Sequence, residues 1–171
     1  MTKIKLSLLV IISLLLISCE EDYQLSSVNP NNWDKRIVKL SPKDSLETGT
    51  TYLSVYSQIY SQTEHRTHNL TVTISMRNTN KKDSVFIQNA EYFHTDGTSI
   101  RRYFDKSIFI APMETIEIII DELDQEGGTG ANFLFDWMIR PGTHEPFFEG
   151  VMISTYGQQG LSFTTEGKRI E

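Results

Sequence analysis

The stretch Asn69–Arg77, NLTVTISMR, alternates strictly between polar and apolar side chains. Its apolar positions are Leu70, Val72, Ile74 and Met76. Successive side chains of a β-strand point to opposite faces, so this pattern predicts a strand with one buried face and one solvated face. No window of the chain shows a convincing helical period. The stretch therefore sets the expectation of an all-β fold.

Similar short patterns recur on both sides of this stretch. The further expected strands lie at 51–60, 84–95, 99–104, 107–112, 113–122, 133–140, 147–156 and 161–165. The alternation is untidy near Asn89 and Ala90, which predicts a β-bulge, and Asp96-Gly97 is a strong hairpin turn signal. Short strands separated by turns every eight to twelve residues or so are typical of sandwiches. We expect an all-β, antiparallel, immunoglobulin-like β-sandwich of about seven to nine strands, with a small barrel as the second choice.

The amino-terminal residues have the pattern of a secretory signal peptide. Lys3 and Lys5 precede an apolar run, Leu6–Ile17, that only two serines interrupt. Twelve residues rise only about 18 Å as a helix, whereas the hydrocarbon core of a bilayer is about 30 Å thick. The run therefore predicts a cleaved signal over residues 1–18 and not a membrane-spanning helix.

Cys19 is the only cysteine of the 171 residues, and it follows this signal directly. The sequence Leu16-Ile17-Ser18-Cys19 resembles a bacterial lipobox. The resemblance implies cleavage before Cys19, thioether lipidation of its sulfur and acylation of the new amine. Two or three acyl chains anchor a protein stably, whereas one does so only marginally. We therefore expect Cys19 to attach the protein to a membrane of the bacterial cell envelope, with the outer membrane favoured.

The residues after Cys19 read as a flexible tether over 19–48, followed by one β-sandwich domain over 49–171. Trp33 and the stretch 36–40 qualify this interpretation, because they could dock on the domain or form an edge strand. Three acids, at 20–22, resemble the export tag of Bacteroidota-type surface lipoproteins, but a solvated spacer explains them equally well. A cell-surface and a periplasmic position both stay open.

The charge balance limits the classes of partner. The formal net charge is −6, and removal of Lys3 and Lys5 with the signal makes it −8. An acidic surface disfavours nucleic acids and anionic membrane surfaces as partners. Without a second cysteine, the chain has no disulfide to form, and the domain depends on its hydrophobic core.

No motif predicts catalysis or a cofactor. A nucleophile elbow of the Gly-x-Ser-x-Gly type is absent, and so is a cysteine nucleophile beyond the lipidation site. Four histidines, His65, His68, His94 and His144, could form a metal site only if the fold gathered them. Zinc needs three or four ligands in tetrahedral reach, and we expect no metal here.

The candidate partner surfaces are of two kinds. Three tyrosines, Tyr52, Tyr56 and Tyr60, line one side of the expected first strand, where they could stack on a sugar or anchor a protein. Tyrosine also simply favours strands, and that explanation competes. The second surface surrounds the glycine-rich loop Gly127–Gly130, and its candidate residues are Asp121, Asp124, Asn132 and Asp136. Whether this loop serves function or only structure is open.

Several stretches together resemble a bacterial family of unknown function, DUF3124. They are VYSQIY, LTVTISMRNT, YFHTDG, RRYFDKSIFIAP and GGTGANFLFDW, within residues 50–156. Members are exported or lipid-anchored, which agrees with the lipobox. The resemblance implies no catalytic residues. It does imply that the family pattern includes Tyr103, Asp105, Pro112, Gly128, Gly130, Asn132 and Trp137.

Three functions follow as hypotheses. The first is a membrane-anchored, non-enzymatic envelope protein whose β-domain binds a protein or glycan partner. The second is an accessory or hydrolytic factor that acts on a cell-wall or polysaccharide substrate through the acids between Asp121 and Asp136. The third is a periplasmic metal-binding domain that uses the four histidines.

Overall fold

The computed structural model describes residues 31–41, 44–156 and 159–171, so Cys19 and the signal lie outside the described residues. In this part of the chain, no helix is long and apolar enough to cross a membrane. The described elements are α2 (Asn31–Asp34), β1 (Glu47–Ser54), β2 (Gln58–Ser61), β3 (Thr63–Asn69), β4 (Thr71–Arg77), β5 (Val85–Phe93), β6 (Ser99–Arg102), β7 (Ile108–Ile110), β8 (Thr115–Ile120), β9 (Asn132–Ile139), β10 (Phe147–Tyr156), β11 (Gln159–Glu166) and β12 (Lys168–Arg169).

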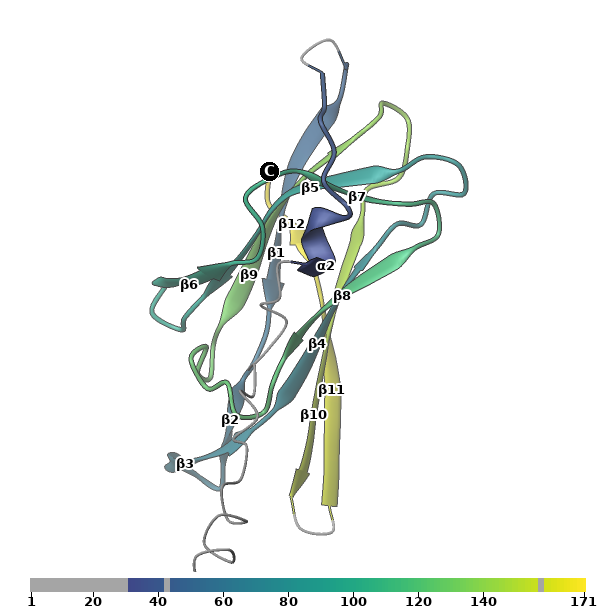
Figure 1. Cartoon of the computed structure of the whole chain (residues 1–171). Helices are drawn as coiled ribbons and strands as arrows, with labels where there is room; N and C mark the ends of the chain where they lie inside the picture. Colours follow the sequence, from purple (N-terminus) through teal and green to yellow (C-terminus); the bar gives the residue numbers. More distant parts are fainter. Residues whose placement is uncertain (1–30, 42–43, 157–158) are drawn as a thin grey trace, which may run out of the picture.

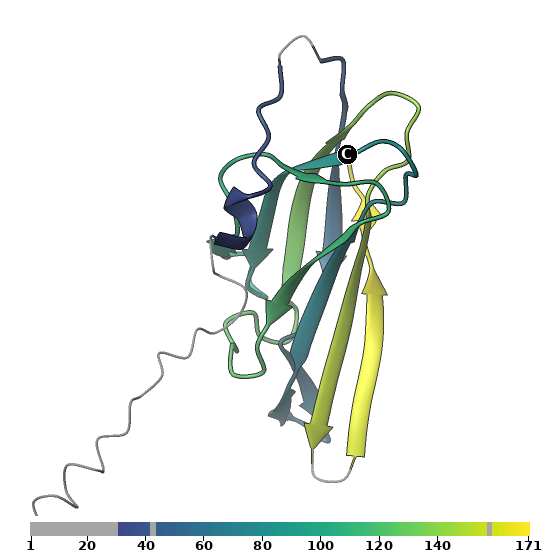
Figure 2. The ribbon, with the colours of Figure 1, turned by 45° about the vertical axis from the view of Figure 1, so that its right-hand side comes forward.

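The strands form an antiparallel β-sandwich, as the sequence predicts. A six-stranded sheet has the order β12-β1-β9-β5-β6, with β7 also paired to β5, and a four-stranded sheet has the order β11-β10-β4-β8. Figures 1 and 2 show these two layers, with the β2–β3 hairpin at the lower end. The described strands number twelve instead of seven to nine. The difference arises because the expected strand 51–60 divides into β1 and β2, and because β3 and β12 were not expected.

The core lies between the two sheets. Most of the stretch 69–77 forms β4, and Leu70 lies directly before this strand. The side chains of Leu70, Val72, Ile74 and Met76 are all fully buried. Stacked aromatic rings run along the inner face of the six-stranded sheet, with the Tyr92–Phe133 centroids 4.8 Å apart and the Phe133–Phe135 centroids 5.4 Å apart. The Phe135–Phe148 pair, at 4.3 Å, links this sheet to the four-stranded sheet. Such ring pairs stabilise a fold beyond the burial of their area, by about 0.5–1.5 kcal/mol each.

Both irregularities expected in the β5–β6 region are present. The register of β5 against β9 shifts between Ile87 and Asn89, which places a bulge next to the untidy alternation. In the turn, Gly97 has a φ of 86°, and the His94 N–H donates to the Thr98 carbonyl at 2.8 Å. The Thr98 N–H donates to Asp96 at 2.8 Å, and this bond is the main cause that lowers the pKa of Asp96 to about 2.

The described part of the expected tether is docked on the sandwich. Trp33 is buried, with its ring 5.2 Å from that of Phe104, and the Val38 N–H donates to the Ser107 carbonyl at 2.9 Å. The Phe109 N–H donates in turn to the Arg36 carbonyl at 3.0 Å. The described residues 33–38 thus lie against the sandwich, which is the docked arrangement that the sequence left open. Burial of the Trp33 ring supplies the physical reason, since a free chain would leave it in water.

Candidate functional site

The outer face of the six-stranded sheet carries a continuous row of hydrogen-bonded polar side chains. Thr50 Oγ1 donates to Asp136 Oδ1 at 2.8 Å, and Asn89 Nδ2 reaches Asp136 Oδ2 at 3.2 Å. Farther along, Ser99 Oγ and Arg102 Nη2 donate to Glu91 at 2.6 and 3.0 Å. We call these six residues the polar ladder: Thr50, Asp136, Asn89, Glu91, Ser99 and Arg102. It crosses β1, β9, β5 and β6.

Three of the predicted surface residues lie on this same face. Thr50 pairs with Asp136, Tyr52 with Leu134, and Ser54 with Asn132 in the β1–β9 register. Because these positions alternate with the buried Thr51 and Leu53, their side chains all point away from the core. Antiparallel pairing thus brings Tyr52, Asn132 and Asp136 together.

The expected stripe of three tyrosines does not exist as one surface. β1 ends at Ser54 and β2 begins at Gln58, so the alternation is broken between Tyr52 and the other two. Tyr56 turns to the opposite layer, where its ring makes an edge contact with Phe163 at 5.8 Å. Tyr60 is 61% exposed and lines a hollow of about 270 Å³ at the lower end of the molecule, together with Ile59, His68 and Leu161.

Asp124 is buried in an ion pair instead of lying on the surface. Its carboxylate accepts from Arg101 Nη1 at 2.7 Å, and Glu126 accepts from Arg101 Nη2 at 2.5 Å. The Arg101 guanidinium lies 5.8 Å from the centre of the Tyr92 ring, on the inner side of the sheet. Burial is the largest single effect and would lower the pKa of Arg101, but the hydrogen bonds to Asp124 and Glu126 and the nearby negative charges together outweigh it and raise the pKa. Arg101 therefore fastens the β8–β9 loop to β6.

The glycine-rich part of this loop is shaped by close contact with β5. A Cβ at Gly127 would collide with the Tyr92 hydroxyl, and Gly128 has a φ of 72°, which favours glycine. Thr95 holds the loop in place, because its hydroxyl donates to the Gly127 carbonyl at 3.0 Å and accepts from the Gly130 N–H at 2.9 Å. These contacts give the glycines a structural role.

The four candidate acidic and amide residues of this region are not one site. Asp124 is bound to Arg101 on the inner side of the sheet, whereas Asp136 belongs to the outward-facing polar ladder. Asn132 lies on the same face as Asp136, four residues away along β9. Asp121 closes a turn by accepting from the Leu123 N–H at 2.9 Å. Asp121, Asp124 and Asp136 therefore do not converge on one bond of a substrate.

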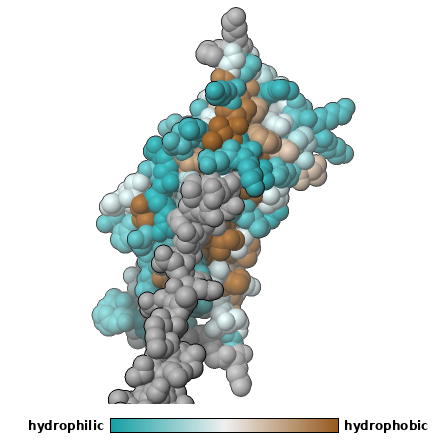
Figure 3. Space-filling model, in the orientation of Figure 1, coloured by the Kyte–Doolittle hydropathy of each residue, from teal (hydrophilic) through white to brown (hydrophobic). Residues whose placement is uncertain are grey.

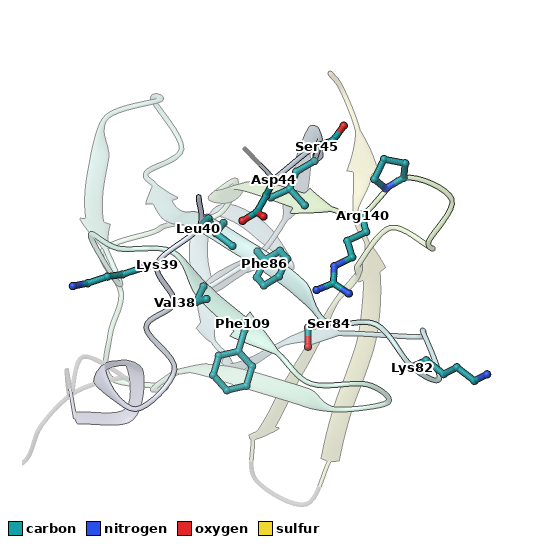
Figure 4. A pocket seen from close by; sticks show the side chains of 12 residues that line it. Val38, Lys39, Leu40, Asp44, Ser45, Lys82, Ser84, Phe86, Phe109 and Arg140 are labelled. Atoms are coloured by element: carbon teal, nitrogen blue, oxygen red, sulfur yellow. The ribbon is translucent and has the colours of Figure 1, made fainter. Parts of the chain in front are cut away.

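A groove of about 650 Å³ lies at the upper end of the six-stranded sheet. Figure 3 shows hydrophobic residues at that end and in further patches lower down, and Figure 4 shows the groove from close by. We call it the strap groove, because residues 38–40 and 44–46 line one side of it. Its lining residues are Val38, Lys39, Leu40, Asp44, Ser45, Leu46, Lys82, Ser84, Phe86, Phe109, Arg140 and Pro141.

The histidines lie in different parts of the fold. His65 is exposed on β3, His94 is in the β5–β6 turn beside Asp96, and the His144 backbone is bonded to Asn80. Among the residues that the structure describes, no three His, Cys, Asp or Glu side chains are grouped so that they could hold a metal ion.

The polar ladder and the strap groove could not be found from the sequence alone. Alternation placed the ladder residues on the polar faces of their strands. Which strands lie side by side depends on the order β1-β9-β5-β6, which pairs Thr50 with Asp136 although they are far apart in sequence. The groove has no local sequence signal, since Val38, Phe86 and Arg140 come from three separate segments.

Comparison with known proteins gives a family but no activity. A crystal structure titled Thermotoga maritima 1070 aligns with 70% of this chain and 92% of its own, at 10% identity and a TM-score of 0.45. No curated protein matches. The family model of DUF3124, a protein of unknown function, matches residues 48–170, from the start of β1 to the last residues of the chain. The protein therefore belongs to the DUF3124 family.

Proposed function

We propose that this protein is a lipid-anchored component of the bacterial cell envelope that binds a protein or glycan partner and is not an enzyme. Cys19 holds it to the membrane, with the outer membrane favoured. The binding surface is the outer face of the six-stranded sheet around Tyr52, Asn132 and Asp136. The observation that carries this proposal is the polar ladder, which arranges side chains from four strands on one face.

The ladder has the chemistry of a recognition surface. Ion pairs and hydrogen bonds hold its side chains in fixed positions, so a partner that binds there loses little additional side-chain entropy. Tyr52 is 36% exposed beside them and offers an aromatic face. Tyrosine next to fixed polar groups is common in protein interfaces, and aromatic faces also stack on sugars.

The docked segment supports a position close to the membrane. Fourteen residue steps separate Cys19 from Trp33, and an extended chain covers at most about 3.3–3.6 Å per residue. Once Trp33 is fixed on the sandwich, the lipid attachment point can lie no more than about 50 Å from it. The anchor therefore keeps the binding face near the membrane surface.

The test is site-specific photocrosslinking in intact cells. Benzoylphenylalanine at Tyr52 should give a discrete adduct, whereas the same probe at Ile153, which is 47% exposed on the outer face of the other sheet, should not. Protease treatment of the adduct would identify a protein partner, and glycosidase treatment a glycan. Equal crosslinking from both positions, or none from either, would contradict the proposal.

A further inference from the structure

We infer that β11 pairs with the β11 of a second copy of this chain, so that the four-stranded sheets of the two copies join into one continuous sheet. β11 is an outer strand of its sheet, whose order is β11-β10-β4-β8. Figure 2 shows it in yellow at the right-hand border of the molecule, with no described strand beyond it. The backbone groups on the outer side of such a strand can pair with another chain.

The backbone groups of β11 that point outward follow from its pairing with β10. Glu149 lies opposite Glu166, and the register continues without a shift to the other end of the strand. The next pair beyond Glu166 is hydrogen-bonded, because the Gly167 N–H donates to the Phe148 carbonyl at 2.8 Å. Bonded and non-bonded pairs alternate in an antiparallel ladder, so the N–H and C=O groups of every second residue of β11 point away from β10. These residues are Gly160, Ser162, Thr164 and Glu166, and all four are exposed.

β11 lacks the features by which proteins normally block the edge of a sheet. Such features are a short strand, a proline, a bulge or a charge in the middle of the strand. β11 is the longest edge strand in the described part of the chain, and its single charged residue is the last one, Glu166. The next longest edge strands carry charge within them, β8 at Glu117 and β3 at Glu64 and Arg66. The outer side of β7 is already paired with residues 36–38.

Self-pairing suits this strand in one register. When Phe163 lies on a two-fold axis, opposite the Phe163 of the second copy, all four outward residues have a bonded partner. Each bonded pair exchanges two hydrogen bonds, so four pairs give about eight, and a typical interface has about ten. Glu166 then lies opposite Gly160, so no like charges meet, and Ser162 lies opposite Thr164. A second copy therefore satisfies the whole edge.

Disulfide crosslinking of the full chain in intact cells tests this inference. Directly opposite bonded residues lie about 5.5 Å apart at Cα, within the range of about 4.4–6.8 Å that permits a disulfide. Co-expressed chains with Ser162→Cys and with Thr164→Cys should therefore form a covalent dimer on mild oxidation. Either variant alone should form much less, because its two cysteines are offset by two residues, about 7–8 Å apart. The wild-type chain controls for disulfides through Cys19. No dimer from the mixture, or as much from each variant alone, would overturn the inference.

Two charge variants test the same register by another route. In Ser162→Lys/Thr164→Lys, each lysine lies opposite a lysine of the second copy, so dimerisation should weaken about tenfold or more. In Ser162→Lys/Thr164→Glu, each lysine lies opposite a glutamate, so the dimer should persist. Both positions are exposed, so the fold of each variant should stay intact. Analytical ultracentrifugation of the purified full chain in detergent measures both. Equal dimerisation of the two variants, or a wild-type chain that is monomeric at about 1 mM, would overturn the inference.

This interface is separate from the proposed binding face. β11 belongs to the four-stranded sheet, whereas the polar ladder lies on the six-stranded sheet, so the dimer and the Tyr52 crosslink can fail independently. An adduct from the Ile153 probe that contains only this chain belongs to the dimer, because Ile153 lies beside Ser162. A disulfide from Ser162→Cys to a different protein, with none to a second copy, would show a foreign strand at this edge and overturn the inference.

Discussion

At the scale of single residues, Asn78 joins more of the structure than its polarity suggests. It is buried, and its Nδ2 donates to the carbonyls of Asp83, Ile110 and Ala111 at 2.8–3.0 Å. Its Oδ1 accepts from the N–H and the side-chain amide of Asn80 at 2.9 and 3.0 Å. Asn78 therefore connects the turn after β4 with the turn between β7 and β8.

Replacement of Asn78 should be costly. Asn78→Ala leaves buried carbonyls without donors, and each such loss costs about 1–3 kcal/mol, so we expect a loss of about 3 kcal/mol or more in the free energy of unfolding. Asn69→Ala, at a half-buried position on β3, should cost less than about 1 kcal/mol. Urea denaturation of both variants measures the difference. A similar small loss in the two variants would show that the Asn78 bonds are not needed.

Gly127 tests the structural account of the glycine-rich loop. Gly127→Ala places a methyl group against the Tyr92 hydroxyl and should destabilise the fold by about 1–3 kcal/mol. Gly160→Ala on β11 meets nothing within 4 Å and should be close to neutral. Thermal unfolding of the two variants compares them directly. A neutral Gly127→Ala would mean that the loop moves freely and that packing does not explain its glycines.

At the scale of elements, the docked segment depends on Trp33 more than on its backbone bonds. Trp33→Ala should release the segment, and the amides of Val38 and Phe109 should exchange with solvent on the order of tenfold faster or more, because local opening exposes both bonds. Amides of β10 should be unaffected. Hydrogen exchange measures both. Unchanged exchange at Val38 would show that the strap holds without the ring.

The same segment should respond to acid through Glu114. Its carboxylate accepts from Arg36 at 2.7 Å, and this bond is the main cause that lowers the pKa of Glu114 below its ordinary value of 4.5. A lowered folded pKa stabilises the contact above about pH 4.5, and this stabilisation is lost as the pH falls through the lowered value. Exchange at Val38 should therefore speed up in acid, and Glu114→Gln should remove much of that dependence. An identical acid response in the variant would contradict this role.

The elements show what sequence can and cannot predict. The alternation of Leu70, Val72, Ile74 and Met76 was sufficient to define β4, because a single period decides which face is buried. The docking of Trp33 stayed undecided, since the ring of Phe104 that receives it comes from a distant segment. Asp124 was expected on the surface, and its burial depends on Arg101, a partner that no local pattern reveals.

At the scale of the whole molecule, the inner and outer faces of the sandwich carry different kinds of side chain. The inner faces hold a core that needs no disulfide. The outer face of the six-stranded sheet carries the polar ladder, and the strap groove lies at its upper end. The described amino-terminal segment docks beside that groove, through the bonds of Val38 to Ser107 and of Phe109 to Arg36.

The central claim is that this protein works from a membrane, and lipid labelling of Cys19 tests it most directly. Cells that express the full chain should incorporate labelled palmitate into it and keep it in the membrane fraction. Cys19→Ala should lose both the label and the membrane association, because no other residue of the chain offers a thiol. Labelling that persists in Cys19→Ala, or an unlabelled wild-type chain in the soluble fraction, would contradict the account.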